Sequence, residues 1–145
     1  MKKITLTLLA CCVAFVLNAA EGEWTTDLPK ALQKAKAENK LVFLDFTGSD
    51  WCPPCKALHK NILTSKEFVS YAKTNLVLVE VDFPRSKPQT KELKAANAAL
   101  SKRFNIQGYP TVIVLDAQGK ELKREIGFSG GDPKSYIASL EKLKK

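Results

Sequence analysis

Three short apolar runs, at 41–46, 76–82 and 111–115, constrain most strongly what this chain can fold into. Each run is rich in Val, Leu and Ile and lacks the polar–apolar alternation of a half-exposed strand, so we expect strands covered on both faces. A fourth run, 121–126, does alternate and follows a turn signal that contains Gly119. We expect it to be a hairpin partner at the edge of the sheet.

Amphipathic stretches separate these runs. Apolar residues recur with helical spacing near 28–38, 91–104 and 134–144, which predicts three helices. Asp132 followed by Pro133 is a typical start for the last of them. Strands that alternate with helices and end in a hairpin and a helix predict an α/β fold, a three-layer sandwich in which helices flank a central mixed sheet.

The composition fits one ordinary domain. The chain has 145 residues, of which 45% are hydrophobic and 26% charged, so it is too apolar for a disordered chain. Its net charge is +8, or about +6 without residues 1–20, and that remaining charge is spread over helix faces without interleaved aromatic residues. We therefore expect no nucleic-acid partner, and we expect a monomer.

The N-terminus has the pattern of a secretory signal peptide. Basic residues at 2–3 precede an apolar stretch at 4–17 and small residues at 19–20. We expect residues 1–20 to be removed and residues 21–145 to form an exported domain, periplasmic or secreted. The apolar stretch is shorter than the roughly 20 residues that cross a bilayer as a helix, so we expect no transmembrane span in the mature form.

The four cysteines fall into two close pairs. Cys11 and Cys12 lie within the expected signal peptide, although residues 8–11 also resemble a lipobox, in which Cys11 would be lipidated. Cys52 and Cys55 remain in the mature chain. In an oxidising compartment, a lone pair at this spacing indicates a redox site more readily than a structural scaffold.

The second pair lies between the first buried strand and the start of a helix. Unpaired N–H groups at a helix N-terminus favour the reactive thiolate form of cysteine. Pro53 and Pro54 fit the first turn, where no intrahelical N–H bond is lost. We expect Cys52 to be the nucleophile, exposed at the tip, and Cys55 to be the resolving thiol.

Other interpretations of the pair remain open. It could be a static disulfide, or Cys52 and Cys55 could bind copper together with His59, the only histidine. We expect His59 to be a surface residue, no bound metal and no cofactor. Asp45 lies within an apolar strand, where a carboxylate is costly to bury without a function, so we expect it to relay protons. Trp51 could either shield the thiols or contact substrate.

Three motifs resemble the thioredoxin superfamily over about residues 23–145. They are the segment 51–56 that contains both cysteines, the segment 108–111 before the third strand, and Gly127 after the edge strand. The resemblance implies that Pro110 is cis and lies against the disulfide. It also implies that the Tyr109 backbone pairs with an extended substrate segment, which gives broad recognition.

Within the superfamily, segments 46–52 and 116–128 resemble exported thioredoxin-like proteins and the soluble domain of the bacterial thiol:disulfide interchange reductase. Thioredoxins have a buried aspartate six residues before the first cysteine, whereas Asp45 lies seven before it, so its proton-transfer role assumes a one-residue bulge. The partner lysine of that aspartate is missing, and Glu80 stands in the corresponding region. The segment 83–104 is longer than in a minimal member and is either a tolerated insertion or part of a partner surface.

These observations predict an exported thiol:disulfide oxidoreductase of thioredoxin fold. Its partners would be protein thiols and disulfides and a redox protein that recharges it. Pro54 resembles the reducing members, so we expect a reductase that acts through a mixed disulfide. The alternatives are an oxidase or isomerase of the same fold, a copper-binding metallochaperone, or an interaction domain with a static disulfide.

Overall fold

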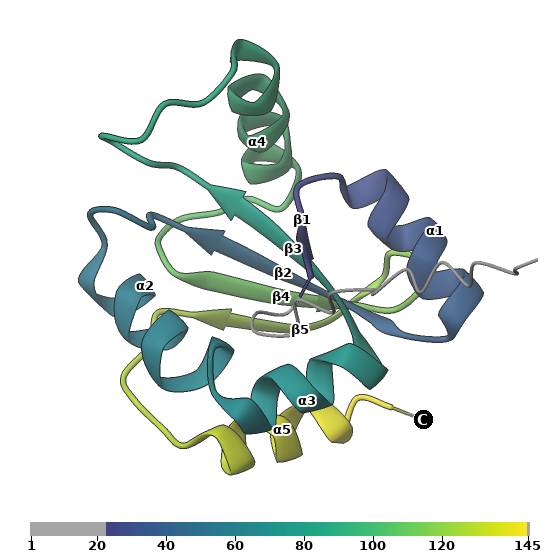
Figure 1. The fold of residues 1–145 in the computed structure, drawn as a ribbon. Coiled ribbons are helices and arrows are strands. Elements are labelled where there is room, and N and C mark those ends of the chain that lie inside the picture. The colour runs from purple at the N-terminus through teal and green to yellow at the C-terminus, as the bar shows by residue number, and fades with distance from the viewer. Residues whose placement is uncertain (1–22, 145) are drawn as a thin grey trace, which may run out of the picture.

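A mixed five-stranded sheet forms the centre of the protein (Figure 1). The structure is a computed structural model that describes residues 23–144, so the expected signal peptide and Cys11 lie outside the described residues. The strand order is β1–β3–β2–β4–β5, with β2 parallel to β3 and antiparallel to β4. The strands are β1 (Trp24–Thr25), β2 (Leu41–Thr47), β3 (Leu76–Asp82), β4 (Thr111–Leu115) and β5 (Glu121–Ile126).

Polar side chains set the start of the long helices. The N-cap side chains of α1, α3, α4 and α5 each accept a hydrogen bond from the backbone N–H three residues further on, which satisfies a donor that the helix leaves free. The helices are α1 (Leu28–Glu38), α2 (Pro53–Leu58), α3 (Lys66–Asn75), α4 (Lys91–Arg103) and α5 (Pro133–Glu141), and a π-helical turn, η1 (His59–Leu63), continues α2.

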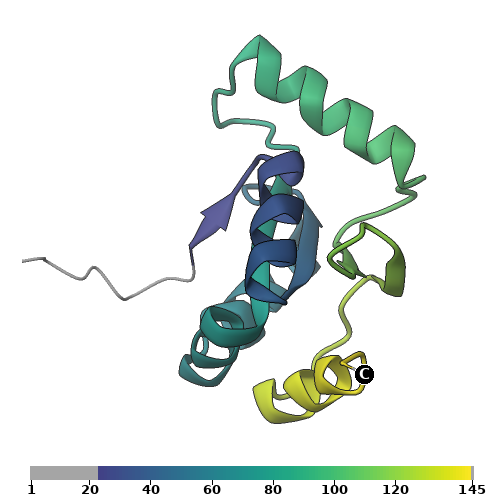
Figure 2. The ribbon, with the colours of Figure 1, turned by 90° about the vertical axis from the view of Figure 1, so that its right-hand side faces the viewer.

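The helices cover both faces of the sheet and enclose two apolar cores. On one face, α1 and the end of α4 pack against Leu44 and Phe46 of β2. On the other face, α2, α3 and α5 pack against Phe43 of β2 and Val112 of β4. Figure 1 shows α1 and α4 apart from the group of α2, α3 and α5, and Figure 2 shows α4 and α5 at opposite ends of the molecule. The expected three-layer sandwich with a mixed sheet is confirmed.

The apolar runs predicted the strands closely. The second, third and fourth runs match β3, β4 and β5, and the first extends by one residue to Thr47. Two elements have no counterpart among the expected ones, β1 and α3. The apolar pattern of α3 is short, with Phe68 and Ala72 as its buried residues. β1 has only two residues, too few for a pattern, and it is held by its pairing with β3 and by the packing of Trp24 against Phe43.

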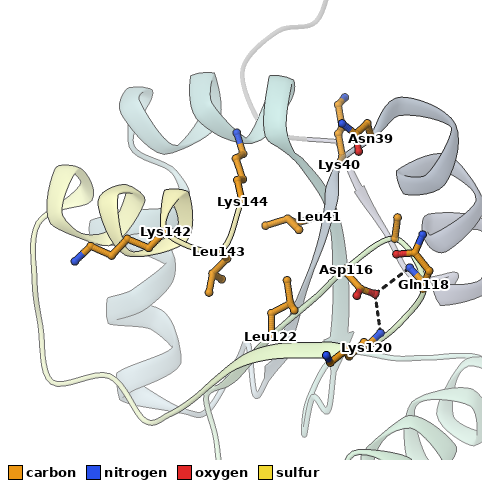
Figure 3. A pocket seen from close by; sticks show the side chains of 11 residues that line it. Asn39, Lys40, Leu41, Asp116, Gln118, Lys120, Leu122, Lys142, Leu143 and Lys144 are labelled. Atoms are coloured by element: carbon orange, nitrogen blue, oxygen red, sulfur yellow. Dashed lines mark hydrogen bonds between the residues drawn. The ribbon is translucent and has the colours of Figure 1, made fainter.

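A hollow of about 760 Å³ lies at the end of the sheet where β2 begins (Figure 3). Its wall includes Leu41 at the start of β2, Asp116 directly after β4 and Lys144 near the C-terminus. A strand rises about 3.3 Å per residue, so roughly 20 Å of β2 separates this hollow from the strand's other end. The cysteines follow that other end. Within residues 23–144, no helix has the length and apolar character needed to cross a membrane.

Candidate active site

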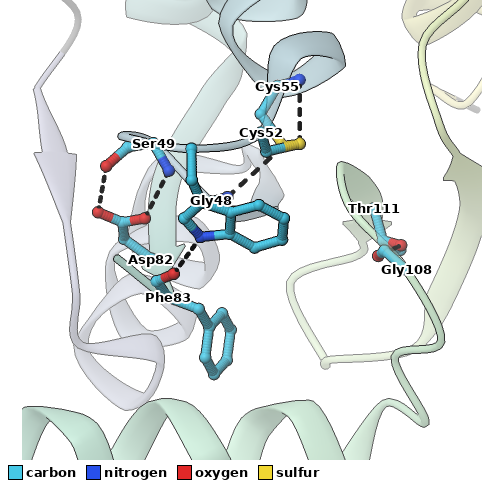
Figure 4. The surroundings of a disulfide bond; sticks show 9 residues. Gly48, Ser49, Cys52, Cys55, Asp82, Phe83, Gly108 and Thr111 are labelled. Atoms are coloured by element: carbon cyan, nitrogen blue, oxygen red, sulfur yellow. Dashed lines mark hydrogen bonds between the residues drawn. A yellow bond between two sulfur atoms is a disulfide. The ribbon is translucent and has the colours of Figure 1, made fainter. Parts of the chain in front are cut away.

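The two mature-chain cysteines form a disulfide at the start of α2 (Figure 4). Their Cα atoms are 5.3 Å apart. Cys52 is the N-cap residue of α2, and its Sγ accepts a hydrogen bond from the Cys55 N–H at 3.3 Å. Pro53 and Pro54 occupy the first helical positions, where no backbone bond is lost. The same N–H group would stabilise negative charge on Cys52 once the disulfide is reduced.

The expectation that Cys52 is exposed at the tip is wrong. Only 2% of Cys52 and 3% of Cys55 is exposed. The sulfur of Cys52 is bonded to Cys55 and turned back over the first turn of α2, whereas the neighbouring Pro53 is exposed. In this disulfide form, Pro53 is therefore exposed while both cysteines are buried.

This chain has one more residue between Asp45 and Cys52 than thioredoxins have between the corresponding residues. The turn before Cys52 accommodates it. Pairing between β2 and β3 is continuous from Leu41 to Thr47, so the expected bulge does not lie in the strand. Instead, the Cys52 N–H donates to the Gly48 carbonyl oxygen at 2.9 Å and closes a helical turn. The Gly48 N–H in turn points to the Cys55 sulfur at 3.5 Å. The turn thus contacts both cysteines.

Trp51 packs across this turn. Its indole Nε1–H donates to the Phe83 carbonyl oxygen at 2.8 Å (Figure 4). A Cβ atom on Gly48 would lie 2.5 Å from Trp51 Cε2. Trp51 also makes an edge-to-face contact with Tyr109, with ring centroids 5.9 Å apart. Packing is therefore one role of Trp51, and glycine at position 48 makes room for it.

Replacing Gly48 with alanine is expected to lower the free energy of unfolding by about 1–3 kcal/mol, because the added methyl group meets the indole ring in a packed site. Denaturant unfolding followed by Trp51 fluorescence in a Trp24→Phe background would measure it. Gly108→Ala is the matched control, since a Cβ there meets nothing within 4 Å. Equal losses for the two variants would contradict the steric explanation.

The cis-proline loop contains the second group of expected site residues. The Tyr109–Pro110 bond is cis, as the resemblance implies. The Pro110 carbonyl oxygen accepts a hydrogen bond from the Gly127 N–H at 2.7 Å, which fixes this loop to the end of β5. Within residues 23–144, the Tyr109 backbone forms no hydrogen bond to other backbone groups or side chains. An extended partner segment could therefore use its N–H and C=O groups.

Asp45 is buried in the middle of β2, with 5% exposed. Side chains alternate along a strand, so Asp45 shares the face of Phe43, which α2, α3 and α5 cover. Its Oδ1 atom has no hydrogen-bond partner among the described residues. Burial raises the pKa of Asp45 from 3.8 to about 7, and the negative charges of Glu80 and Asp82 add to the rise.

Glu80 lies beside Asp45 in the neighbouring strand. Burial and the charge of Asp82 raise the pKa of Glu80, while the positive charges of Lys87 and His59 oppose that rise. The carboxylate of Glu80 thus lies next to Asp45, in the region where thioredoxins have a lysine. Glu80 therefore favours the protonated form of Asp45.

Two further polar residues near Asp45 had no signal in the sequence. Val112 pairs with both Asp45 and Glu125, so the two carboxyl groups occupy one row across the sheet. Tyr136 of α5 faces the same region, and its hydroxyl group has no partner among residues 23–144. Burial raises the pKa of Tyr136, and the charges of Glu125 and Asp45 contribute. Only the packing of α5 on the sheet brings these groups together.

His59 is exposed at the start of η1. Across the described part of the chain, no group of three His, Cys, Asp or Glu side chains is arranged to hold a metal ion. The structure therefore does not bring His59 together with Cys52 and Cys55 as a ligand set.

The long segment after β3 is bound to the active-site turn. Asp82 accepts hydrogen bonds from the Ser49 N–H and hydroxyl group at 2.9 and 2.6 Å (Figure 4). Its carbonyl oxygen accepts from the side-chain amide of the buried Asn97 in α4 at 2.9 Å. Asp50 accepts from three successive backbone N–H groups that begin at Arg85. The segment is thus part of the surroundings of the disulfide.

A family model described as a thioredoxin-like domain matches residues 28–144, and the folded site has the disulfide and the cis-proline that the sequence resemblance implied. The chain belongs to this thioredoxin-like family. It is 36% identical over 129 residues to the disulfide bond reductase DsbH of Chlamydia pneumoniae, an alignment that covers 89% of this chain and 76% of DsbH. The solved structure of a DsbH oxidoreductase superposes with a TM-score of 0.79 at 32% identity, over 99% of this chain and 93% of that one.

The match to DsbD is confined to one part of that longer protein. The thiol:disulfide interchange protein DsbD of Cronobacter sakazakii is 40% identical over 70% of this chain, which spans only 16% of DsbD. The oxidised C-terminal domain of Neisseria meningitidis DsbD superposes with a TM-score of 0.59 at 24% identity, over 83% of this chain and 99% of that one, a likeness of fold. The expected α/β thioredoxin fold and the resemblance to the interchange reductase are confirmed, and the homologues are thiol:disulfide oxidoreductases.

Proposed function

We propose that the protein reduces disulfide bonds of other proteins through Cys52 and Cys55. The observation that carries the proposal is the Cys52–Cys55 disulfide at the start of α2, in a chain that also has a cis-proline at position 110. The name of DsbH, a disulfide bond reductase similar over most of both chains, supports the same direction of electron flow. The Cys-Pro-Pro-Cys sequence resembles the reducing members of the family.

The reaction begins with both cysteines reduced. The Cys52 thiolate attacks one sulfur of the partner disulfide, a mixed disulfide forms, and the other partner sulfur leaves as a thiolate that takes up a proton. The Cys55 thiolate then attacks Cys52 Sγ and releases the second partner sulfur, which is also protonated. The partner gains two electrons and two protons, and Cys52 and Cys55 end as a disulfide. A dithiol of another redox protein would restore the starting state.

Asp45 is proposed as the group that accepts the Cys55 proton before the second step. A carboxyl group with a pKa of about 7 is divided between its two protonation states near neutral pH, so it can both take and return a proton there. Its burial beneath α2, which contains Cys55, supports this role. A surface carboxyl group would be almost fully ionised at the same pH.

Trp51, Tyr109 and Pro110 are proposed to form the partner-binding surface. The free backbone groups of Tyr109 would pair with an extended segment of the partner, and Pro110 has no N–H to compete. Ile126 pairs with Thr111 at the edge of the sheet and exposes 62% of its surface. It would give a partner an apolar contact next to the loop.

Export of the protein remains a proposal that rests on the pattern of residues 1–20. Residues 21–145 would then act in the periplasm or outside the cell as a monomer. Lipidation of Cys11 is the alternative processing route. Mass measurement of the exported protein would separate a chain that begins near residue 21 from a lipidated one that begins at Cys11.

Redox titration of Cys52 and Cys55 against glutathione tests the direction of electron flow. We expect a reduction potential at or below about −250 mV, within the range of reducing thioredoxins. A value near −120 mV is typical of a strong oxidant and would overturn the reductase proposal. Stoichiometric copper in the purified protein, together with no reduction of any disulfide substrate, would favour the metallochaperone instead.

A further inference from the structure

We propose that Arg85 binds an acidic side chain of the partner protein next to the partner's cysteine. The inference rests on the proposed function and deepens it, because it names the chemistry that selects among disulfide partners. It also gives the long segment after β3 a role in recognition. Three observations carry it: the fixed backbone at Arg85, the position of its guanidinium group on Trp51, and the lack of a nearby carboxylate partner.

The backbone at Arg85 is held in place by Asp50. The Asp50 carboxylate accepts from the Arg85 N–H at 3.0 Å, from the Ser86 N–H at 2.6 Å and from the Lys87 N–H at 3.1 Å. These bonds hold the pKa of Asp50 below its usual range. These bonds therefore tie the exposed loop at Arg85 to the residue two positions before Cys52.

The guanidinium group of Arg85 lies over the Trp51 ring, 3.9 Å from its centroid. One face of this planar group is thus occupied by the indole, while its N–H donors lie along the edge. Arg85 is exposed. Stacking restricts the side chain, so less conformational freedom is lost when the edge pairs with a carboxylate.

The charge of Arg85 is not neutralised by a salt bridge. Within residues 23–144, no carboxylate lies within 4.0 Å of its guanidinium nitrogens. The two carboxylates of this region have other partners, since Asp50 binds backbone N–H groups and Asp82 binds Ser49. The Lys87 ammonium group donates to the Ser49 hydroxyl group and adds a second positive charge. The carboxylates of Asp50 and Asp82 offset much of this positive charge over the region, so the group that favours an anionic partner is the unpaired edge of the Arg85 guanidinium group.

Aromatic contacts connect Arg85 with the expected path of the partner segment. Trp51 contacts Tyr109 edge-to-face, and Phe83 lies against Tyr109 with ring centroids 5.3 Å apart. A segment paired with the Tyr109 backbone would thus run beside the wall on which Arg85 is stacked. An Asp or Glu near its cysteine could reach the guanidinium edge and form two parallel hydrogen bonds.

Three peptide disulfides test the inference. They differ only in the two residues that flank the cysteine, which are Glu in the first peptide, Gln in the second and Lys in the third. The rate constant for reduction by the fully reduced protein is measured for each peptide at low salt. We expect the Glu peptide to react about fivefold faster than the Gln peptide, and the Lys peptide to be the slowest. The Glu-to-Gln ratio should fall towards one in Arg85→Gln, and Arg85→Glu should favour the Lys peptide. Salt near 0.5 M should weaken the preference by screening, which acts over about 10 Å at 0.1 M.

Arg103→Gln is the matched control, because Arg103 is also an exposed arginine over an aromatic ring, 5.1 Å from the Phe104 centroid. It should keep the wild-type ratio. Equal rates for all peptides with the wild type, or an unchanged ratio in Arg85→Gln, would overturn the inference while leaving the reductase proposal intact. So would a uniform loss of rate in Arg85→Gln with the ratio preserved, since Arg85 would then only support Trp51. No reduction of any peptide by the wild type would overturn the proposed function itself.

Discussion

Replacing Cys52 with serine is expected to lower the rate of disulfide reduction by about a thousandfold or more. A serine hydroxyl group stays protonated near neutral pH and cannot replace the thiolate that attacks the partner. Cys55→Ser should behave differently, because it keeps the nucleophile and loses only the resolving thiol. It should accumulate a mixed disulfide with the partner, visible as a reductant-sensitive mass increase on Cys52.

The two variants control for each other, since each removes one thiol and the same disulfide. An adduct on Cys55 in the Cys52→Ser protein, with none in Cys55→Ser, would reverse the assigned roles. The N-cap geometry argues against that reversal: Cys52 Sγ accepts the Cys55 N–H at 3.3 Å, and this bond favours the thiolate at Cys52. A partner trapped by neither variant would contradict the mixed-disulfide mechanism.

Asp45→Asn is expected to change both stability and rate in a pH-dependent way. In the unfolded chain, Asp45 loses its proton near pH 3.8, whereas the folded carboxyl group keeps it up to about pH 7. The folded state therefore binds more protons between these values, and wild-type stability falls as the pH rises through this window. The shift corresponds to about 4 kcal/mol, lost fully only above pH 7.

Asparagine does not titrate, so the free energy of unfolding of Asp45→Asn relative to the wild type should rise by about 4 kcal/mol between pH 4 and pH 8. Urea unfolding of both oxidised proteins measures this difference. Glu92→Gln, at an exposed position in the first turn of α4, should lower stability by no more than about 1 kcal/mol. A difference between Asp45→Asn and the wild type that stays constant with pH would contradict the raised pKa.

The rate of thiol–disulfide exchange tests the proposed role of Asp45 in the mechanism. Asp45→Asn should slow release of the partner from the mixed disulfide near neutral pH, because the Cys55 thiol loses its proton acceptor. Glu80→Gln is the matched comparison: it removes a charge that raises the pKa of Asp45, so the pH midpoint of the step should move down while the step survives. An unchanged release rate in Asp45→Asn would remove Asp45 from the mechanism.

The continuous apolar runs were sufficient to predict β2, β3 and β4, because a strand covered on both faces has little tolerance for polar residues. The alternating run after the turn at Gly119 predicted β5. The position of Cys52 between a buried strand and a helix could also be predicted from neighbouring residues. Its burial could not, since it depends on how the sulfur turns back over the first turn of α2. The distance of Asp45 from Cys52 along the chain could likewise be read from the sequence. The place of the extra residue could not, and the structure has it in the turn that begins at Gly48 rather than in the strand.

By itself, the sequence determined the sheet with its helices, the cysteine pair at a helix start and an aspartate in an apolar strand, because each of these is a pattern of neighbours along the chain. Only the tertiary structure decided what surrounds them. Asp45 meets Glu80 through strand pairing, and Trp51 meets Arg85 because Asp50 and Asp82 bind the two loops together. Contacts of this kind join residues more than 30 positions apart and depend on register and packing, which no local pattern encodes.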